Sequence, residues 1–144
     1  MDKASKQAKR ALEAIALSNE RLIDLTVKLR FRSEVTEVLH DLDVRRYESG
    51  STVEGYVDAQ LQNGKGICWW LEINCDEDKW LFESRVTVSN LRVDEGSEDL
   101  IRFEDKTAET LDEFVTSLEK ATSELVESAN SIDLNTCERI ASPD

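Results

Sequence analysis

Two glutamates are the residues of this chain whose type and spacing most suggest acid–base chemistry. Glu72 and Glu83 belong to neighbouring segments in which apolar and polar residues alternate, a pattern that predicts two adjacent strands. Both occupy polar positions of the alternation, so both point to the same face of the predicted sheet. Paired carboxylates perform general acid–base catalysis in some enzymes. Because the sequence adds neither a cofactor motif nor a sign of a pocket, we assign no catalytic residues.

Histidine and cysteine offer little further chemistry. The single histidine, His40, lies between Leu39 and Asp41 without a nucleophile motif such as GxSxG, so we interpret it as an ordinary surface or edge histidine. The three cysteines, Cys68, Cys75 and Cys137, form no CxxC pair, which is typical of reduced thiols. A zinc site would need three or four ligands at suitable spacing. We therefore predict no bound metal and no cofactor.

Two acidic runs are the remaining candidates for a cation site. Asp76-Glu77-Asp78 and the run from Asp94 to Asp99 both combine several carboxylates within a few residues. Neither has the EF-hand arrangement, in which acids alternate before a glycine and a final glutamate. We interpret both runs as solvent-exposed turns.

The elements that would position these residues begin with a long helix. Apolar residues recur at steps of three and four between residues 3 and 30, without glycine or proline, which predicts one helix over 3–30. Residues 33–47 fit either a short helix or a first, bulged strand that runs from Phe31 to Arg46 and is rich in β-branched residues. We favour the strand, because the strands that follow need an edge.

The middle of the chain predicts an antiparallel meander with one strongly apolar face. Alternating segments cover residues 53–61, 67–75 and 80–88, a shorter one covers 100–103, and Gln62 to Gly66 have the composition of a hairpin loop. A second helix is predicted over 108–128, with Thr110 and Glu113 as a capping box or Thr107 as the alternative cap.

The fold class predicted is therefore α+β. A four- to five-stranded antiparallel meander is flanked by the long N-terminal helix and the C-terminal helix, in a single domain over residues 1–129. Residues 130–144 lose the apolar pattern and are expected to form a loosely ordered tail, with Ile132, Leu134 and Ile140 as possible anchors. The predicted core contains Leu12, Ile15, Leu22, Leu29, Val57, Trp69, Leu71, Ile73, Phe82, Val86, Phe114 and Leu118.

Aromatic residues predict a binding patch on the polar face of the sheet. Trp69 and Trp70 are neighbours in one strand, so they point to opposite faces, and Trp70 must leave the apolar face. Pairing Leu61 with Ile67 would place Asp58 opposite Trp70 and Tyr56 opposite Glu72. Either of two registers for the next hairpin places Arg85 beside or diagonal to Trp70. We therefore predict a protein-binding patch of residue types common in binding hot spots, namely Tyr56, Trp70, Leu81 and Arg85. Alternatively, a helix or the tail covers this face.

Charge is distributed unevenly along the chain. The net charge of the 144 residues is −13, which argues against a surface for nucleic acid. Residues 1–32 carry eight basic and four acidic residues, net +4, whereas residues 33–144 carry ten basic and 27 acidic residues, net −17. This acidity serves solubility in many proteins, or else it complements a partner with a basic surface.

The order of elements resembles small acidic bacterial α+β proteins, including immunity proteins of toxin systems. The segments that carry the resemblance are Cys68 to Ile73, Trp80 to Glu83, and Thr110 to Phe114 leading to Leu118 and Leu125. Such proteins bind a cognate toxin and perform no chemistry. The resemblance therefore implies a non-enzymatic protein-binding module, an inhibitor or immunity protein that neutralises a basic partner.

Two other functions stay open. Secretion chaperones also combine helices with a small sheet, are acidic and dimerise, so a chaperone-like or dimeric structural protein is an alternative. An enzyme that uses acidic residues on the sheet is the other. The first residues lead into no apolar segment and no apolar run has the length of a membrane span, so we expect a cytoplasmic protein without a signal peptide or membrane contact.

Overall fold

The computed structural model describes residues 3–47, 50–76, 79–90 and 96–140 of the chain. Its elements, in chain order, are α1 (Lys3–Arg30), β1 (Val35–Tyr47), β2 (Gly50–Leu61), β3 (Lys65–Asp76), β4 (Lys79–Asn90), β5 (Ser97–Arg102), β6 (Lys106–Ala108), α2 (Leu111–Glu127), a 3₁₀-helix (Ser128–Ser131), β7 (Ile132–Asp133) and β8 (Glu138–Arg139). Within the described residues, no helix is both long enough and apolar enough to cross a membrane.

The sheet is an antiparallel meander in which strands follow one another in the order β1-β2-β3-β4-β5. β6 pairs with the first part of β4, so β5 and β6 together form an interrupted outer strand. β1 is a strand and not a helix, although it begins at Val35 and not at the predicted Phe31. Its register with β2 shifts between Val35 and Glu37, which agrees with the predicted bulge. The predicted α+β fold and its meander are thus confirmed.

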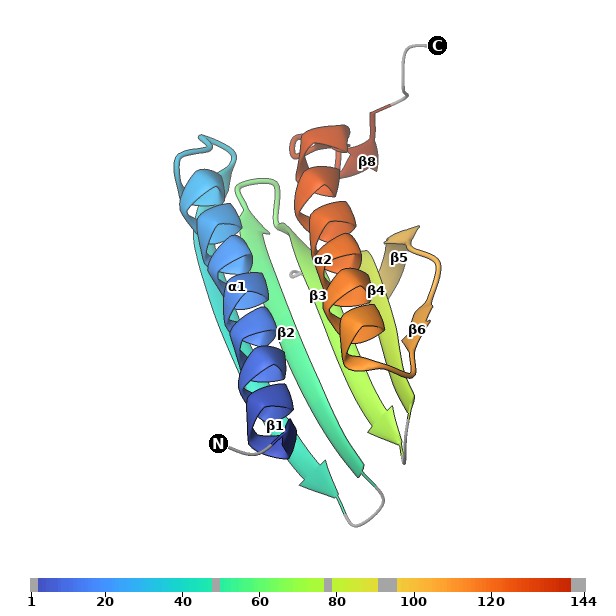
Figure 1. Ribbon diagram of the computed structural model, residues 1–144. Helices are drawn as coiled ribbons and strands as arrows, with labels where there is room; N and C mark the ends of the chain where they lie inside the picture. Colours follow the sequence, from blue (N-terminus) through green and yellow to red (C-terminus); the bar gives the residue numbers. More distant parts are fainter. Residues whose placement is uncertain (1–2, 48–49, 77–78, 91–95, 141–144) are drawn as a thin grey trace.

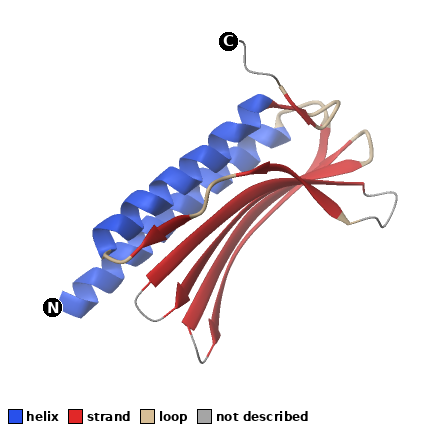
Figure 2. Ribbon diagram, turned by 90° about the vertical axis from the view of Figure 1, so that its right-hand side faces the viewer, coloured by secondary structure: helices blue, strands red, loops and turns tan. Residues whose placement is uncertain are grey.

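Both helices lie on the same side of the sheet (Figure 2). They run side by side in the same direction, with α1 in front of β1 and β2, and α2 in front of β3 and β4 (Figure 1). Polar contacts join them along their length: Arg10 forms an ion pair with Asp112 at 3.0 Å, and the hydroxyls of Ser18 and Thr122 are 2.8 Å apart. α2 begins at the predicted cap, where the Thr110 side chain accepts a hydrogen bond from the Glu113 backbone N–H at 3.2 Å.

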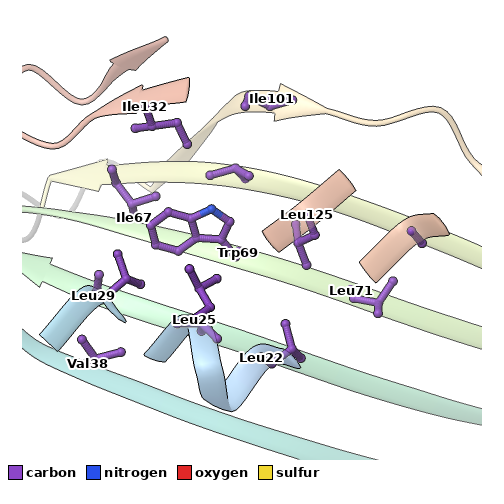
Figure 3. Packing of buried hydrophobic residues seen from close by; sticks show 14 of the residues in the cluster. Leu22, Leu25, Leu29, Val38, Ile67, Trp69, Leu71, Ile101, Leu125 and Ile132 are labelled. Atoms are coloured by element: carbon purple, nitrogen blue, oxygen red, sulfur yellow. The ribbon is translucent and has the colours of Figure 1, made fainter. Parts of the chain in front are cut away.

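The core fills the space between the helices and the apolar face of the sheet (Figure 3). Trp69 is fully buried at its centre, with Leu25 of α1 on one side and Leu125 of α2 on the other. Ten of the twelve predicted core residues are buried, namely Leu22, Leu29, Val57, Trp69, Leu71, Ile73, Phe82, Val86, Phe114 and Leu118. The apolar alternation of the strands was therefore sufficient to identify the buried face.

Leu12 is a wrong core prediction, and Ile15 is only partly buried. The buried side of α1 follows Ser18, Leu22, Leu25 and Leu29, at steps of four and three residues. Leu12 lies on the flank of this stripe and is 66% exposed. Leu12 fits the helical spacing of the apolar residues, which is why it was predicted in the core. The position of the sheet decides which part of the apolar surface of α1 is buried, and Leu12 lies outside that part.

The chain after α2 is more regular than the loosely ordered tail that we predicted. Up to residue 140 it forms the 3₁₀-helix and the β7–β8 hairpin, and two of the three predicted anchors, Ile132 and Leu134, are each 2% exposed. The third, Ile140, is 51% exposed. Short apolar anchors between turns gave no periodic signal, which is why the sequence pattern missed this hairpin. Residues 141–144 lie outside the described part of the chain.

Candidate functional site

The side of the sheet that faces away from both helices is the candidate site, and we call it the open face (Figure 2). Its residues alternate along each strand with those of the core, as Trp70 does with Trp69 and Leu71. Among the described residues, no helix lies over it. The alternative that a helix covers this face is therefore wrong for α1 and α2, because both helices bury their apolar sides against the apolar face of the sheet.

The central row of the open face carries its aromatic residues. Asp41 of β1, Tyr56 of β2, Trp70 of β3, Arg85 of β4 and Arg102 of β5 occupy directly opposed positions on the five strands. The Arg85 guanidinium lies over the Trp70 ring, 4.5 Å from the ring centroid, which is a cation–π contact. Tyr56, Trp70 and Arg85 are all partly exposed. We call these three the aromatic row.

The structure brings three of the four predicted patch residues together. Tyr56 and Arg85 flank Trp70 on either side, whereas Leu81 lies two open-face positions further along β4, beyond Glu83. Leu81 thus shares the face but not the row. Whether any of the four binds a protein stays a prediction.

The predicted register of the first hairpin is wrong by two residues. Tyr56 lies opposite Trp70, and Asp58 lies opposite Cys68. The hairpin is shorter than the five-residue loop we expected: the Gly64 N–H donates to the Leu61 carbonyl at 3.1 Å, and Gly64 adopts a φ of 85°. A shift by two leaves every side chain on its face, because the side-chain period of a strand is two.

A row of four carboxylates runs beside the aromatic row. Asp43, Glu54, Glu72 and Glu83 occupy directly opposed positions on β1, β2, β3 and β4, and we call them the carboxylate row. Asp43 pairs with Arg45 at 3.0 Å, and Glu72 accepts a hydrogen bond from the Asn74 side-chain amide at 2.9 Å. Within the described part of the chain, Glu54, Glu72 and Glu83 form no ion pair with a basic side chain.

The carboxylate row lowers the stability of the fold. Like charges at directly opposed positions of neighbouring strands destabilise a sheet. Glu72 and Glu83 were predicted from the sequence as a pair, whereas Asp43 and Glu54 were not predicted as members of this row. The polar alternation of β1 and β2 contained the necessary signal, but the register that aligns these residues with Glu72 comes from the hairpin turn.

The acidic residues of the open face outnumber the basic ones. The acidic residues at open-face positions with described side chains are Glu37, Asp41, Asp43, Glu54, Asp58, Glu72, Glu83 and Asp99, and the basic ones are Arg45, Lys79, Arg85 and Arg102. The excess of negative charge on this face agrees in sign with the net charge of the whole chain. The face therefore attracts cationic groups.

The pKa of the Cys68 thiol reflects the burial and the negative charge of the open face around it. Burial, together with the negative charges of Asp58 and Glu54, raises the pKa of Cys68 to about 12, although the positive charge of Arg85 acts in the opposite direction. Burial also raises the pKa of the neighbouring Asp58 carboxyl. Cys68 is thus held as a neutral thiol in a negatively charged, partly desolvated environment. Such a cysteine is a poor nucleophile, because the thiolate is the reactive form.

Cys68 is therefore expected to react more than tenfold more slowly with iodoacetamide at pH 8 in the folded protein than in the unfolded chain. The comparison is made by quenched alkylation followed by peptide mass spectrometry, with the same peptide from urea-unfolded protein as the reference. Equal rates in the two states would contradict this account of its environment.

His40 has a structural role on the opposite face. One ring nitrogen, Nδ1, is 2.9 Å from the Tyr56 carbonyl oxygen, and the other, Nε2, is 2.8 Å from the Asn19 side-chain oxygen on α1. Both ring nitrogens are thus occupied in joining β1 to β2 and to the helix. Of the predicted alternatives, a surface or an edge histidine, the position on the edge strand β1 agrees with the second.

The acidic runs add no metal site within the described residues. No group of three or more His, Cys, Asp or Glu side chains is arranged to hold a metal ion there. Asp76 ends β3, and Glu98 and Asp99 belong to β5, so the prediction that both runs form turns is wrong for these residues. Glu77, Asp78 and the part of the second acidic run at 94–95 lie outside the described residues.

A groove also lies on the helical side, between α1 and α2. It encloses about 190 Å³, and its walls include Leu17, Val115 and Leu118 with Arg10 and Arg21. Arg10 is paired with Asp112, and Arg21 donates a hydrogen bond to the Ser123 hydroxyl. Residues of both charge signs line it, since Glu13 and Glu119 also contribute, so its charge favours no class of ligand.

Comparisons of this chain with protein-family models, with curated proteins and with solved structures find no match.

Proposed function

We propose that this chain is a non-enzymatic protein-binding module whose open face binds a partner with a basic surface. The observation that carries the proposal is the carboxylate row, in which Glu54, Glu72 and Glu83 oppose one another without a basic partner among the described residues. Folds tolerate a broken rule of this kind mostly at functional positions, where a partner supplies the missing interaction.

The aromatic row supports the same proposal. Tryptophan, tyrosine and arginine are the residues most enriched in binding hot spots, and Tyr56, Trp70 and Arg85 lie together beside the carboxylates. An aromatic centre flanked by charge is the arrangement of many interfaces, because the apolar part supplies affinity and the charges supply orientation and fast association. Inhibition of a basic toxin is the specific form of this proposal that the family resemblance suggests.

Self-association is a second candidate, and one observation favours it. Exposed large apolar side chains gather on α1 and the residue that follows it, at Leu12, Leu17, Ile23, Val27 and Phe31. These residues lie away from the open face, so a dimer formed through them leaves the carboxylate row accessible.

Glu72→Gln is expected to stabilise the free protein slightly and to weaken partner binding. The substitution removes repulsion with Glu54 and Glu83 and keeps the acceptor oxygen for Asn74, so the free energy of unfolding should rise by about 0.2–1 kcal/mol. Urea denaturation measures this. The protein retained by the wild-type chain from a host lysate is then identified and purified, and its affinity for Glu72→Gln should be several-fold lower.

Glu119→Gln is the matched control, because Glu119 is an exposed glutamate on α2. It should change neither stability nor affinity. Binding should also weaken between low and moderate salt, because exposed charges are screened over about 8–10 Å at physiological ionic strength. A purified partner that binds the two variants equally, or whose surface is acidic, would disprove the proposed function.

A further inference from the structure

The direction of the carboxylate row limits how a partner can reach it. On β3 the open-face residues include Cys68, Trp70, Glu72 and Asn74, so an element lying along this strand meets one member of the row. The same holds for the neighbouring strands, each of which contributes a single carboxylate to the row. An element that meets the whole row must therefore lie across the strands.

The spacing of the row selects the kind of element. Neighbouring strands lie about 4.8 Å apart, so four strands space the first and last positions by roughly 14 Å. In an α-helix, positions i, i+3, i+7 and i+10 lie on one side and span about 15 Å, because each residue rises 1.5 Å. In an extended strand, four side chains on one face span roughly 20 Å. The helical spacing matches the row, and the extended spacing exceeds it.

The neighbouring aromatic row agrees with a helix in this position. Tyr56 and Trp70 lie two residues along their strands from Glu54 and Glu72, which corresponds to about 6.7 Å. A helix with its side chains is about 10–12 Å wide, so one helix covers both rows. Its basic stripe would lie over the carboxylates, and an apolar stripe beside it would contact the two aromatic rings.

We propose that the partner binds through a basic amphipathic α-helix that lies across β1 to β4, with Lys or Arg at i, i+3, i+7 and i+10 over Asp43, Glu54, Glu72 and Glu83. The inference rests on the proposed function and specifies the partner's binding element. Charge complementarity supports it directly: within the described residues, Glu54, Glu72 and Glu83 lack a basic partner. Three cations of the helix would each supply one, and the fourth would lie over Asp43, which already pairs with Arg45.

Two synthetic peptides of identical composition test the inference. The first is an alanine-rich peptide stapled into a helix, with lysines at i, i+3, i+7 and i+10 and leucines on the adjacent stripe. The second peptide contains the same amino acids without the staple, and its lysines stand at alternate positions. Fluorescence anisotropy at low salt measures binding to the wild-type chain, to Glu54→Gln/Glu72→Gln, and to the control Glu119→Gln/Glu127→Gln on α2.

The helical peptide should bind the wild-type chain and the control at least tenfold more tightly than the alternating peptide does. Glu54→Gln/Glu72→Gln should weaken its binding at least tenfold. The alternating peptide could instead bind the wild-type chain equally well and lose its binding to Glu54→Gln/Glu72→Gln. That result would disprove the helical binding element but would still support a partner with a basic surface. If the helical peptide binds all three proteins alike, or binds none of them, the proposed helix is disproved, and the Glu72→Gln measurement on the purified partner decides the proposed function independently.

Discussion

Trp69→Ala is expected to lower the free energy of unfolding by about 3–5 kcal/mol, because it removes the largest fully buried side chain of the core. Trp69 is 0% exposed and lies between Val57 of β2 and Val86 of β4, both also 0% exposed. The two helices cover Trp69 on the side opposite the sheet (Figure 3). A cavity at this position is enclosed on every side, so relaxation of the neighbours recovers little of the lost contact.

Urea denaturation followed by circular dichroism measures the loss, and the slope of the transition should stay unchanged if only the folded state is affected. Phe114→Ala on α2 is a second test of the same core. Phe114 is 3% exposed, and its ring centroid lies 5.2 Å from that of Trp80 and 5.4 Å from that of Phe82. It should also cost about 3–5 kcal/mol. Unchanged midpoints for both variants would show that this core assignment is wrong.

Trp70→Ala is expected to leave the free protein nearly as stable, with a loss of about 1 kcal/mol or less, and to weaken partner binding by about 2 kcal/mol or more. Trp70 is the next residue of the same strand, but it is partly exposed and contacts Arg85 from the open face. The cation–π contact that it loses contributes about 0.5–1 kcal/mol at an exposed site. In a complex, the same ring would be desolvated by the partner, which increases its contribution.

Trp69→Ala and Trp70→Ala are matched controls for each other, because both truncate a tryptophan to alanine in the middle of β3. Calorimetric titration with the purified partner gives the change in affinity, and static light scattering shows whether that partner is a second copy of this chain. A large loss of stability with unchanged association would assign Trp70 to the core and remove the aromatic row from the interface.

The local pattern of residues determined the elements and the faces of this protein. Steps of three and four residues without glycine or proline define α1, and the alternation around Trp69 and Trp70 separates the core face of β3 from the open face. Thr110 and Glu113 marked the start of α2 correctly. These features depend on neighbours within a few residues, and such interactions are visible in the sequence itself.

Tertiary structure decided how those elements meet. The hairpin turn at Gly64 sets the register that aligns Glu54 with Glu72 and Tyr56 with Trp70, and a two-residue change in the turn leaves the alternation identical. The helices both cover the apolar face, which left Leu12 on an outer flank and the open face uncovered. The β7–β8 hairpin buries Ile132 and Leu134 without any periodic signal. The alternation of a strand has the same period in every register, so it cannot show which residues of neighbouring strands lie opposite one another. Apolar spacing likewise does not reveal which element covers an apolar face. The carboxylate row and the aromatic row therefore exist only once the strands are paired.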